Sequence, residues 1–441
     1  MSTSSPAPDT LAPQLQHVRQ QIADGHLEQA AHALNALQPL HPRDVRLPLM
    51  GMRLAERAGN LPGAVQAARH ALALAPDWPV TLIELATLLL RQGQHDEALT
   101  HARRAVAVAP DEPQAMLRAV AIASDAGAPQ QAVDWAQAVL ARQPQAHFMR
   151  LLLAQALFKQ GAFAQASEQF TQLVASHPDN AAAGLGLVAS LLKLGDNAAA
   201  AEQADALLAR LPGEEDVRYW HALAHGQTPA TQPRATVTAV FDGMAPGYDL
   251  HMVRQLGYRL PERVAQALLA LYPDRRFNLL DLGCGTGLLG LYLGRIEGHI
   301  IGVDLSQPMI EQAARHQVYS RFHQVNLLDA LRDTPSEHYE AVACLDTLIY
   351  AGELPPVVDG AHRVLKPGGH FIFSCESAPE DGPDLVLNAN TARYAHKPSH
   401  AERLCREAGF DEVTLEHLDA LRTEAGQPVP GFIVTARKPA A

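Results

Sequence analysis

The sequence is poor in cysteine, lacks a long apolar run and carries no excess of positive charge. Its four cysteines are Cys284, Cys344, Cys375 and Cys405. They form no CxxC pair, which predicts free thiols in a reducing cytoplasm rather than a disulfide framework. No stretch of about 18 apolar residues occurs, so no membrane-spanning helix is expected. A formal net charge of −12 repels phosphates and argues against non-specific binding to nucleic acid or an anionic membrane.

The remaining composition is that of a globular protein with more than one domain. Of the 441 residues, 47% are hydrophobic and 19% are charged, and a chain of this length predicts two or three domains. The N-terminal "MSTSSPAPDT" has neither a basic region nor an apolar run. We therefore expect no signal peptide, and a disordered leader over residues 1–10.

Three residue types recur in the first half with a common step of 34 residues. The prolines are Pro42, Pro76, Pro110, Pro144, Pro178 and Pro212; the glycines are Gly25, Gly59, Gly93, Gly127, Gly161 and Gly195; the alanines are Ala30, Ala64, Ala98, Ala132, Ala166 and Ala200. This phase indicates a repeated two-helix unit, in which glycine closes one helix, alanine allows close helix approach and proline ends the second helix. Because one unit cannot bury its own apolar face, the units are expected to stack into a solenoid.

The phase resembles the tetratricopeptide repeat (TPR) family over about residues 11–214, as six repeats. "EEDVRYWHALAHG" is expected to be a capping helix, so that the array spans residues 11–226. Gln14, Pro48, Leu82, Met116, Arg150 and Gly184 occupy the position where this family usually has tryptophan. An unrelated helical array is the alternative. The resemblance implies no chemistry, but a groove for a protein or peptide partner, or self-association.

The pattern changes after a segment of glycine, threonine, proline and glutamine, so residues 227–236 are expected to be a linker. Apolar runs of strand length then alternate with helices. They lie near residues 278–281, 299–304, 322–325, 340–345, 370–375, 412–416 and 431–436. Runs that are apolar throughout indicate a parallel sheet with helices on both faces, and such a sheet binds ligands at the carboxyl ends of its strands.

The glycine-rich "FNLLDLGCGTGLLGLYLG" follows the first of these strands. Its glycines Gly283, Gly285 and Gly287 are spaced G-x-G-x-G, rather than the G-x-G-x-x-G of a dinucleotide loop, and no G-K-[ST] is present. Asp281 precedes them, and a carboxylate there repels a phosphate but suits a ligand with a cationic amine and a sulfonium. Asp304 ends the second strand, where an acid accepts the two hydroxyls of a ribose. That ribose belongs to NAD and to S-adenosylmethionine alike.

Asp281 and the alternate-glycine loop together resemble the class I S-adenosylmethionine (SAM)-dependent methyltransferases. Segments on both sides resemble a bacterial group of TPR-repeat methyltransferases. The fold expected from the resemblance is an α-solenoid followed, over residues 237–441, by an α/β Rossmann-like domain with a seven-stranded, mostly parallel sheet. The resemblance implies that SAM is bound by Tyr248, Arg259, Asp281, Gly283, Cys284, Gly285, Gly287, Asp304, Leu305, Met309, Asn326 and Leu327.

The catalytic candidates follow the fourth and fifth strands. In a methyl transfer the enzyme excludes water, aligns the nucleophile and, where required, removes a proton. Asp346 and Tyr350 in "CLDTLIYAG" and His396 in "RYAHKPSH" are the candidates for this work, with Glu376, Arg393 and Tyr394 as further pocket residues. No cysteine or acid cluster completes a metal site with His396 and His400, so no metal is expected.

Three functions remain open from the sequence. The first is an active SAM-dependent methyltransferase whose TPR array docks a partner, with a protein-bound or carrier-bound acceptor favoured. The second is a catalytically inactive TPR scaffold that retains a SAM-binding domain. The third is a nucleotide-dependent oxidoreductase. The sequence identifies neither the acceptor nor the partner.

Overall fold

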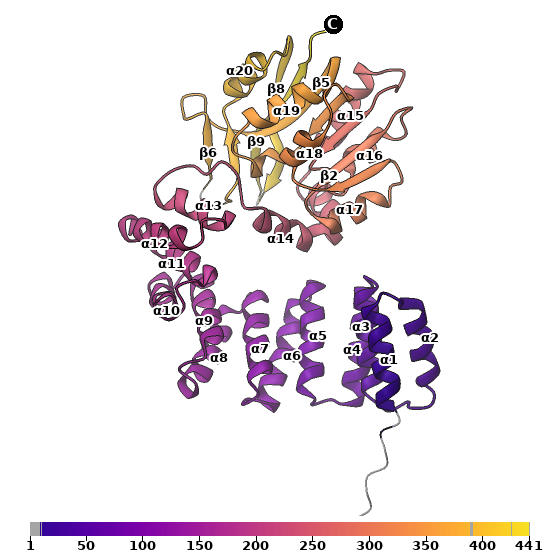
Figure 1. Cartoon of the computed structure of the whole chain (residues 1–441), viewed down its shortest axis with the longest axis vertical. Coiled ribbons are helices and arrows are strands. Elements are labelled where there is room, and N and C mark those ends of the chain that lie inside the picture. The colour runs from indigo at the N-terminus through magenta and orange to yellow at the C-terminus, as the bar shows by residue number, and fades with distance from the viewer. Residues whose placement is uncertain (1–8, 10, 389–390, 425, 441) are drawn as a thin grey trace, which may run out of the picture. The chain divides into compact units, whose positions relative to one another are not determined.

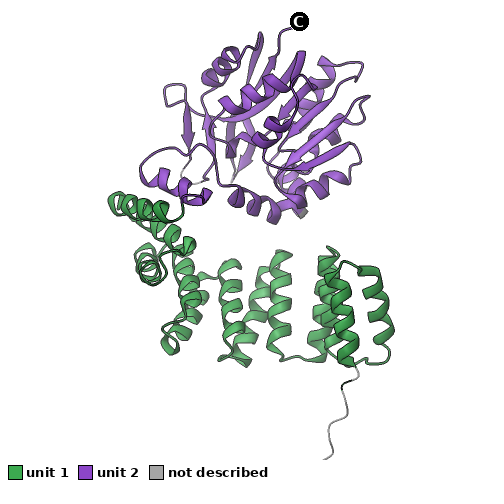
Figure 2. Cartoon of the chain, in the orientation of Figure 1, with its two compact units in different colours: residues 1–211 green, residues 212–441 purple. Residues whose placement is uncertain are grey.

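The computed structural model describes residue 9 and residues 11–388, 391–424 and 426–440. It divides into two compact units, residues 1–211 and residues 212–441 (Figure 2). The predicted leader, apart from Asp9 itself, lies outside the described residues. Within the described ranges, no helix combines the length and apolar character that crossing a membrane requires.

The first unit consists of helices that follow one another in pairs (Figure 1). The pairs are α1 (Leu11–Ala23) with α2 (Leu27–Leu37), α3 (Arg46–Arg57) with α4 (Leu61–Leu74), α5 (Pro79–Arg91) with α6 (His95–Val108), α7 (Pro113–Asp125) with α8 (Pro129–Arg142), α9 (His147–Lys159) with α10 (Phe163–Ser176), and α11 (Ala181–Leu194) with α12 (Asn197–Arg210). These pairs confirm the six predicted repeats. The buried side chains form three successive clusters along the array, because each repeat packs mainly against its neighbours.

The repeated glycines and alanines have the predicted roles. All six glycines adopt the left-handed conformation, with φ between 70° and 83°. A Cβ added to Gly93 would meet no atom within 4 Å, so the backbone angle rather than lack of space selects glycine there. All six alanines are fully buried on the second helix of each pair.

The compact units divide before the last helix of the predicted array rather than after it. Helix α13 (Glu215–Ala224), assigned above to the repeat array, groups with the second unit. The predicted linker 227–236 is also partly wrong, because Thr231 forms a β-bridge with Ala351 and helix α14 (Arg234–Met244) begins within it. The prolines prevent an earlier helix, but the extended backbone still finds partners: the Pro229 carbonyl accepts a hydrogen bond of 2.9 Å from the Tyr394 hydroxyl.

A nine-stranded sheet forms the centre of the second unit. Its strands are β1 (Leu279–Leu282), β2 (Ile300–Asp304), β3 (Arg321–Gln324), β4 (Tyr339–Cys344), β5 (Leu365–Ser377), β6 (Leu385–Leu387), β7 (Tyr394–His396), β8 (Glu412–Glu424) and β9 (Gln427–Arg437). The order β3-β2-β1-β4-β5 is parallel throughout, β9 joins β5 in the antiparallel sense, and β8 pairs with β9. The seven predicted strands are thus confirmed. The sequence missed β6 and β7, which at three residues each are too short to show a periodic pattern.

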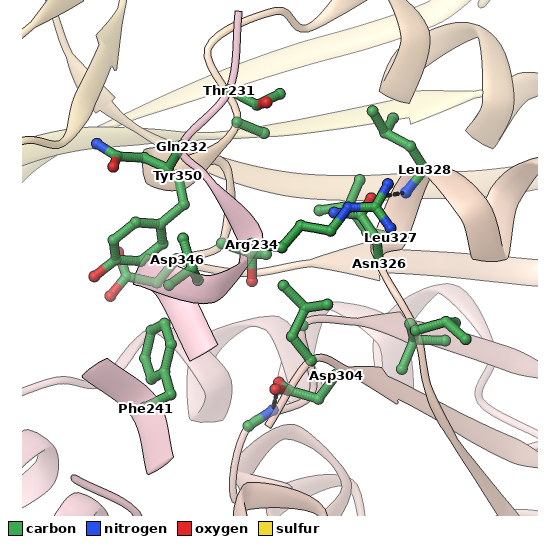
Figure 3. Close-up of a pocket in the computed structure, with 18 of the residues that line it drawn as sticks. Thr231, Gln232, Arg234, Phe241, Asp304, Asn326, Leu327, Leu328, Asp346 and Tyr350 are labelled. Carbon is green, nitrogen blue, oxygen red and sulfur yellow. Dashed lines mark hydrogen bonds between the residues drawn. The ribbon is translucent and has the colours of Figure 1, made fainter. Parts of the chain in front are cut away.

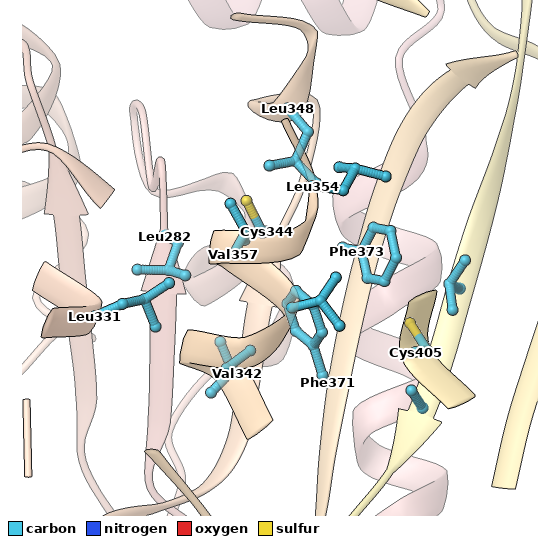
Figure 4. Packing of buried hydrophobic residues seen from close by; sticks show 14 of the residues in the cluster. Leu282, Leu331, Val342, Cys344, Leu348, Leu354, Val357, Phe371, Phe373 and Cys405 are labelled. Carbon is cyan, nitrogen blue, oxygen red and sulfur yellow. The ribbon is translucent and has the colours of Figure 1, made fainter. Parts of the chain in front are cut away.

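Helices cover both faces of this sheet. They are α15 (Leu260–Leu271), α16 (Leu288–Leu293), α17 (Gln307–Ala314), α18 (Leu327–Asp333), α19 (Pro355–Val364) and α20 (Pro398–Glu407), with short turns η1 (Ala245–Gly247), η2 (Leu250–Gln255) and η3 (Leu348–Tyr350). Leu280 and Leu282 of β1 point into the cluster that packs under α18, α19 and α20 (Figure 4). Leu279 points to the opposite cluster, under α15 and α16. Burial on both faces explains why the strands are continuously apolar.

Candidate active site

The glycine loop connects β1 to α16 and needs glycine for two different reasons. Gly283, Gly285 and Gly287 all have positive φ, of 72°, 52° and 80°. A Cβ on Gly283 would lie 2.0 Å from the Thr347 hydroxyl oxygen, and one on Gly287 would lie 2.9 Å from the Ala313 Cβ. A Cβ on Gly285 would meet nothing within 4 Å. The first and third glycines therefore permit close packing, whereas the second faces open space and lines the cleft described below.

Asp304 lies at the carboxyl end of β2, beside this loop. Its Oδ2 accepts a hydrogen bond of 2.8 Å from the Gly285 amide, and its Oδ1 accepts one of 2.9 Å from the Ser306 amide. Burial raises the pKa of the Asp304 carboxyl, and these backbone hydrogen bonds oppose the rise. Each carboxylate oxygen keeps a second lone pair, so both can still accept a ribose hydroxyl.

A cleft that is partly open to solvent lies over the carboxyl ends of the strands (Figure 3). Its described lining consists of Thr231, Gln232, Arg234, Val237, Phe241, Tyr248, Gly283, Gly285, Val303, Asp304, Leu305, Val325, Asn326, Leu327, Leu328, Leu345, Asp346, Thr347, Tyr350 and Ala351. Asp304 supplies an acidic wall and Leu305 and Leu327 an apolar one, while Tyr350 and Asp346 lie together in another part of the cleft.

Helix α14 and the residues after it cover part of the cleft. Arg234 extends across it in Figure 3, and its Nη1 lies 2.8 Å from the Asp329 Oδ2 on α18. The Ser306 hydroxyl donates a hydrogen bond of 2.6 Å to Asp242 of α14. The Phe241 ring lies 5.4 Å from the Tyr350 ring in an edge-on arrangement. We call residues 231–249 the cover segment.

Asp346 is held in an uncommon backbone conformation next to Tyr350. Its φ is 52°, a left-handed value that non-glycine residues adopt at a cost, and its amide donates a hydrogen bond of 2.9 Å to the Ser374 hydroxyl. Its Oδ1 accepts a hydrogen bond of 2.6 Å from Arg422 Nη1. Burial raises the pKa of the Asp346 carboxyl to about 6, and the Arg422 charge opposes that rise.

Arg422 belongs to a buried ionic cluster that extends from Asp346 toward β5 and β8. It also pairs with Glu376 and with Glu424, the latter at 2.6 Å. Arg393 donates hydrogen bonds to Glu424 through its Nη1 and Nη2, and its Nε lies 3.1 Å from Glu376. The hydrogen bonding of Glu424 to Arg393 is the main reason that the pKa of Glu424 falls to about 2. We call these two arginines and three acids the Arg422 cluster.

The structure brings together nine of the fifteen residues that the sequence assigned to cofactor binding or catalysis, and the three further pocket candidates, Glu376, Arg393 and Tyr394, lie outside the cleft lining. Those lining the cleft are Tyr248, Gly283, Gly285, Asp304, Leu305, Asn326, Leu327, Asp346 and Tyr350. Those outside its lining are Arg259, Asp281, Cys284, Gly287, Met309 and His396. Asn326 uses its side-chain oxygen to accept a hydrogen bond of 2.8 Å from the Leu328 amide, capping α18, and one lone pair remains for a ligand.

Three of the residues outside the lining have other partners. Asp281 accepts a hydrogen bond of 2.6 Å from the Tyr319 hydroxyl, and burial raises its carboxyl pKa to about 7. His396 is buried on β7 with its Nε2 2.9 Å from the Gly352 carbonyl oxygen, and burial lowers its pKa to about 4. Arg259 has an exposed side chain and pairs with Glu262. None of these side chains shares the cleft with Asp346.

Sequence reasoning found Tyr248 of the cover segment and Asp346, Glu376 and Arg393 of the Arg422 cluster, but it missed Arg422 and Glu424. Thr231, Gln232 and Arg234 were assigned to the linker, because prolines and glycines were interpreted as linker composition, although proline is also common where a helix begins. Arg422 is 76 residues from Asp346 along the chain, and nothing in "DALRTEAG" distinguishes it from an ordinary charged hairpin.

Comparisons with known proteins find a repeat region followed by a methyltransferase domain, and the repeat match extends through α13, beyond the end of the first compact unit. The family described as a methyltransferase domain matches residues 280–373, and the tetratricopeptide repeat family matches residues 83–147 and 151–225. A malonyl-[acyl-carrier protein] O-methyltransferase of Pseudescherichia vulneris is 30% identical over 205 residues, covering 43% of this chain and 76% of the relative. A ubiquinone biosynthesis O-methyltransferase of Alkalilimnicola ehrlichii is 34% identical over 145 residues, covering 32% of this chain and 53% of the relative.

The extent of these matches varies. This chain spans 25%, 53% and 57% of the length of three curated relatives that it matches. The solved structure of the [4+2]-cyclase SpnF is 20% identical, covers 48% of this chain and 98% of its own, and has a TM-score of 0.41.

Proposed function

Because this chain belongs to the SAM-dependent methyltransferases, we propose that it binds SAM in the cleft of its second unit and methylates an acceptor there. The observation that carries the proposal is the cradle of Asp304 and Gly285. The carboxylate is held by two backbone amides with its remaining lone pairs free, and the glycine beside it leaves open space. A ribose fits this place, because its two hydroxyls can donate hydrogen bonds to the free lone pairs of the carboxylate.

The other lining residues fit the rest of the cofactor. Leu305 and Leu327 would contact the adenine, and Gly283 and Gly285 would lie along the methionine part. Bound SAM supplies a methyl group on a positively charged sulfur, which a nucleophile displaces directly. The cover segment limits the access of water, and Asp346 offers a carboxylate that can accept a proton. Burial raises the pKa of both Tyr248 and Tyr350, so their phenols stay protonated as hydrogen-bond donors.

Calorimetric titration of the full chain with SAM, S-adenosylhomocysteine (SAH) and NADH tests the proposal. We expect SAM and SAH to bind and NADH not to bind. Asp304→Ala should weaken SAM binding by roughly a hundredfold or more, because two charge-assisted hydrogen bonds are lost. Gly285→Arg should abolish it by filling the open side of the loop. The matched control is Asp333→Ala, an exposed acid of the same unit, which should leave the affinity unchanged. NADH binding in place of SAM would instead favour an oxidoreductase.

We further propose that the repeat array docks the protein or carrier that bears the acceptor. The family of these repeats generally mediates protein–protein interaction, and one relative acts, by its name, on a carrier protein. Capture on the immobilised full chain, followed by transfer of a labelled methyl group, should label a captured protein. The alternative is an inactive scaffold, for which capture would occur without label although SAM binds. Light scattering on the same sample separates partner docking from self-association.

A further inference from the structure

Arg422 is the cation in direct contact with the carboxylate at the Asp346 end of the cleft. It lies on β8, its side chain is 2% exposed, and it is shared among Asp346, Glu376 and Glu424. A guanidinium offers five N–H donors in a fixed fork and does not lose its proton in proteins, so it can hold several carboxylates at once. Its position is therefore fixed by three acids from three different segments.

The two oxygens of Asp346 are in different situations. Oδ1 accepts the hydrogen bond from Arg422, whereas Oδ2 takes part in no hydrogen bond between described residues. The amide bond to the Ser374 hydroxyl and the positive φ fix the backbone from the other side. Asp346 thus lines the cleft with one oxygen anchored and one oxygen available, next to Tyr350 (Figure 3).

We propose that Arg422 is a positioning residue that keeps Asp346 ionised, so that Asp346 Oδ2 accepts the proton of a methyl acceptor bearing an O–H or N–H group. The proposal rests on the function proposed above and adds the chemistry of its acceptor. The acceptor's proton passes to Oδ2, and its freed electron pair forms the bond to the methyl carbon. The electrons of the broken carbon–sulfur bond remain on sulfur, which becomes a neutral thioether. No oxidant or further reactant is required.

The charges around the cleft argue against a carboxylate as acceptor. A carboxylate has no proton to give, and it would face the negative charge of Asp346. Arg234 is the single cation among the described lining residues, and it is already paired with Asp329 and Glu215. A hydroxyl or amine, in contrast, can donate a hydrogen bond to Asp346.

The titratable and charged groups that face Asp346 come from five segments. They are Arg422 and Glu424 of β8, Glu376 and Cys375 of β5, Arg393 before β7, Tyr350 of η3, and Tyr248 and Tyr258 between η1 and α15. Burial and the neighbouring acids raise the Asp346 pKa, and the two arginines lower it. Removing Arg422 should therefore leave Asp346 protonated at neutral pH.

The test compares the affinities of SAM and SAH from pH 5 to pH 8.5 by calorimetry, without any acceptor. The two ligands carry the same amino acid, ribose and adenine and differ in the methyl group and the positive charge that it places on sulfur. Because the contacts of the methyl group do not titrate, the pH dependence of the affinity ratio reports how the site responds to that charge. In the wild type we expect the preference for SAM to rise by roughly fivefold or more as Asp346 ionises, with a midpoint near pH 6. Asp346→Asn should remove this step while retaining any contribution of Asp281 and Asp304.

Arg422→Met should move the midpoint up by about one to three pH units, the usual effect of losing an adjacent opposite charge. Arg393→Met is the matched control, since it removes an equally large cation of the same cluster that makes no ion pair with Asp346, and its shift should be smaller. Arg422→Lys keeps the charge but not the fork, and should give an intermediate shift. If the role of Arg422 were merely structural, its substitution would lower the affinities for SAM and SAH by the same factor at every pH.

The proposal is overturned if the midpoint stays at the wild-type pH in Arg422→Met, or in Arg422→Lys should the methionine variant fail to fold. It is equally overturned if Arg393→Met shifts the midpoint as far as Arg422→Met, or if Asp346→Asn retains the wild-type step. Failure of the proposed function has a different signature, because the wild-type chain would then bind neither SAM nor SAH at any pH.

Discussion

Among the described residues, the two units differ in whether they bury ion pairs, because both have exposed pairs but the second unit also has the buried Arg422 cluster. In the first unit, ion pairs join neighbouring repeats at the surface, as with Arg91 and Glu56, whose side chains are 52% and 31% exposed. In the second unit Arg422 and Asp346 are 2% and 7% exposed. Exposed pairs contribute little to stability, whereas buried ones control protonation and orientation. The difference indicates which unit holds the chemistry, because strongly perturbed groups gather at functional sites.

The two units also use glycine differently. Gly93 and Gly283 have nearly the same φ, 74° and 72°. Around Gly93 there is open space, but a Cβ on Gly283 would overlap Thr347. The same residue type therefore closes a helix in one unit and allows two strand ends to approach in the other.

The largest expected effect separates these two glycines. Gly283→Ala should lower SAM affinity by about a hundredfold, because relieving the overlap with Thr347 displaces the loop by a distance on the order of 1 Å. Gly93→Ala should cost only the left-handed backbone strain, about 1–2 kcal/mol, without a change in affinity. Calorimetry with SAM and urea unfolding measure the two quantities. Equal affinity losses in the two variants would mean that crowding is not what distinguishes them.

A second prediction concerns the pH dependence of stability. The folded-state pKa of Asp346, about 6, is above its reference of 3.8, so its stabilising contribution is complete below about pH 4 and is lost as the pH rises to about 6. Asn cannot titrate, so the free energy of unfolding of Asp346→Asn relative to the wild type should rise by about 2 kcal/mol from pH 4 to pH 7. Urea unfolding, following the transition that SAH shifts, provides the measurement.

Asp44 of the first unit is a control, because its contribution to stability is expected to change with pH in the opposite direction. Its hydrogen bonds to Arg46 lower its pKa, so its contribution is present above its unfolded pKa and is lost as the pH falls. Asp44→Asn should therefore be destabilising at neutral pH, and the difference should shrink in acid. The prediction is contradicted if the change in unfolding free energy caused by the two substitutions varies with pH in the same direction.

The smallest effect is expected at the surface of the repeats. Arg91→Ala removes the pair with Glu56 and should change the free energy of unfolding by less than about 1 kcal/mol, since exposed pairs are screened by water and salt. Unfolding at low and high salt checks this, because any loss should diminish as salt is added. A loss as large as that of a buried pair would erase the contrast between the units.

The sequence predicted the repeats and the positions of seven strands because each depends on local requirements. Gly93 has a left-handed backbone, Ala98 is buried where two helices pack closely, and β1 is buried on both faces. Each of these requirements selects residue types within a short stretch of sequence, where the pattern is visible. Asp304 was found for the same reason, since the end of β2 is visible in "IIGVDLS".

The parts that the sequence did not predict depend on contacts between distant segments. Arg422 becomes a partner of Asp346 only when β8 is placed by β9 against β5. His396 was a candidate by residue type, but the fold buries it against the Gly352 carbonyl. The docking of residues 229–232 depends on partners such as Tyr394, which the local proline pattern does not reveal.

The fit of Thr347 against Gly283 limits how the cleft can change. Thr347 lies one residue after Asp346 and also fills the space that a Gly283 side chain would need. A larger side chain at position 347 should therefore distort the glycine loop as well as the Asp346 end of the cleft. Under the proposed function, a change of acceptor should thus be tolerated better through substitutions in the cover segment, for example at Phe241, than at Thr347.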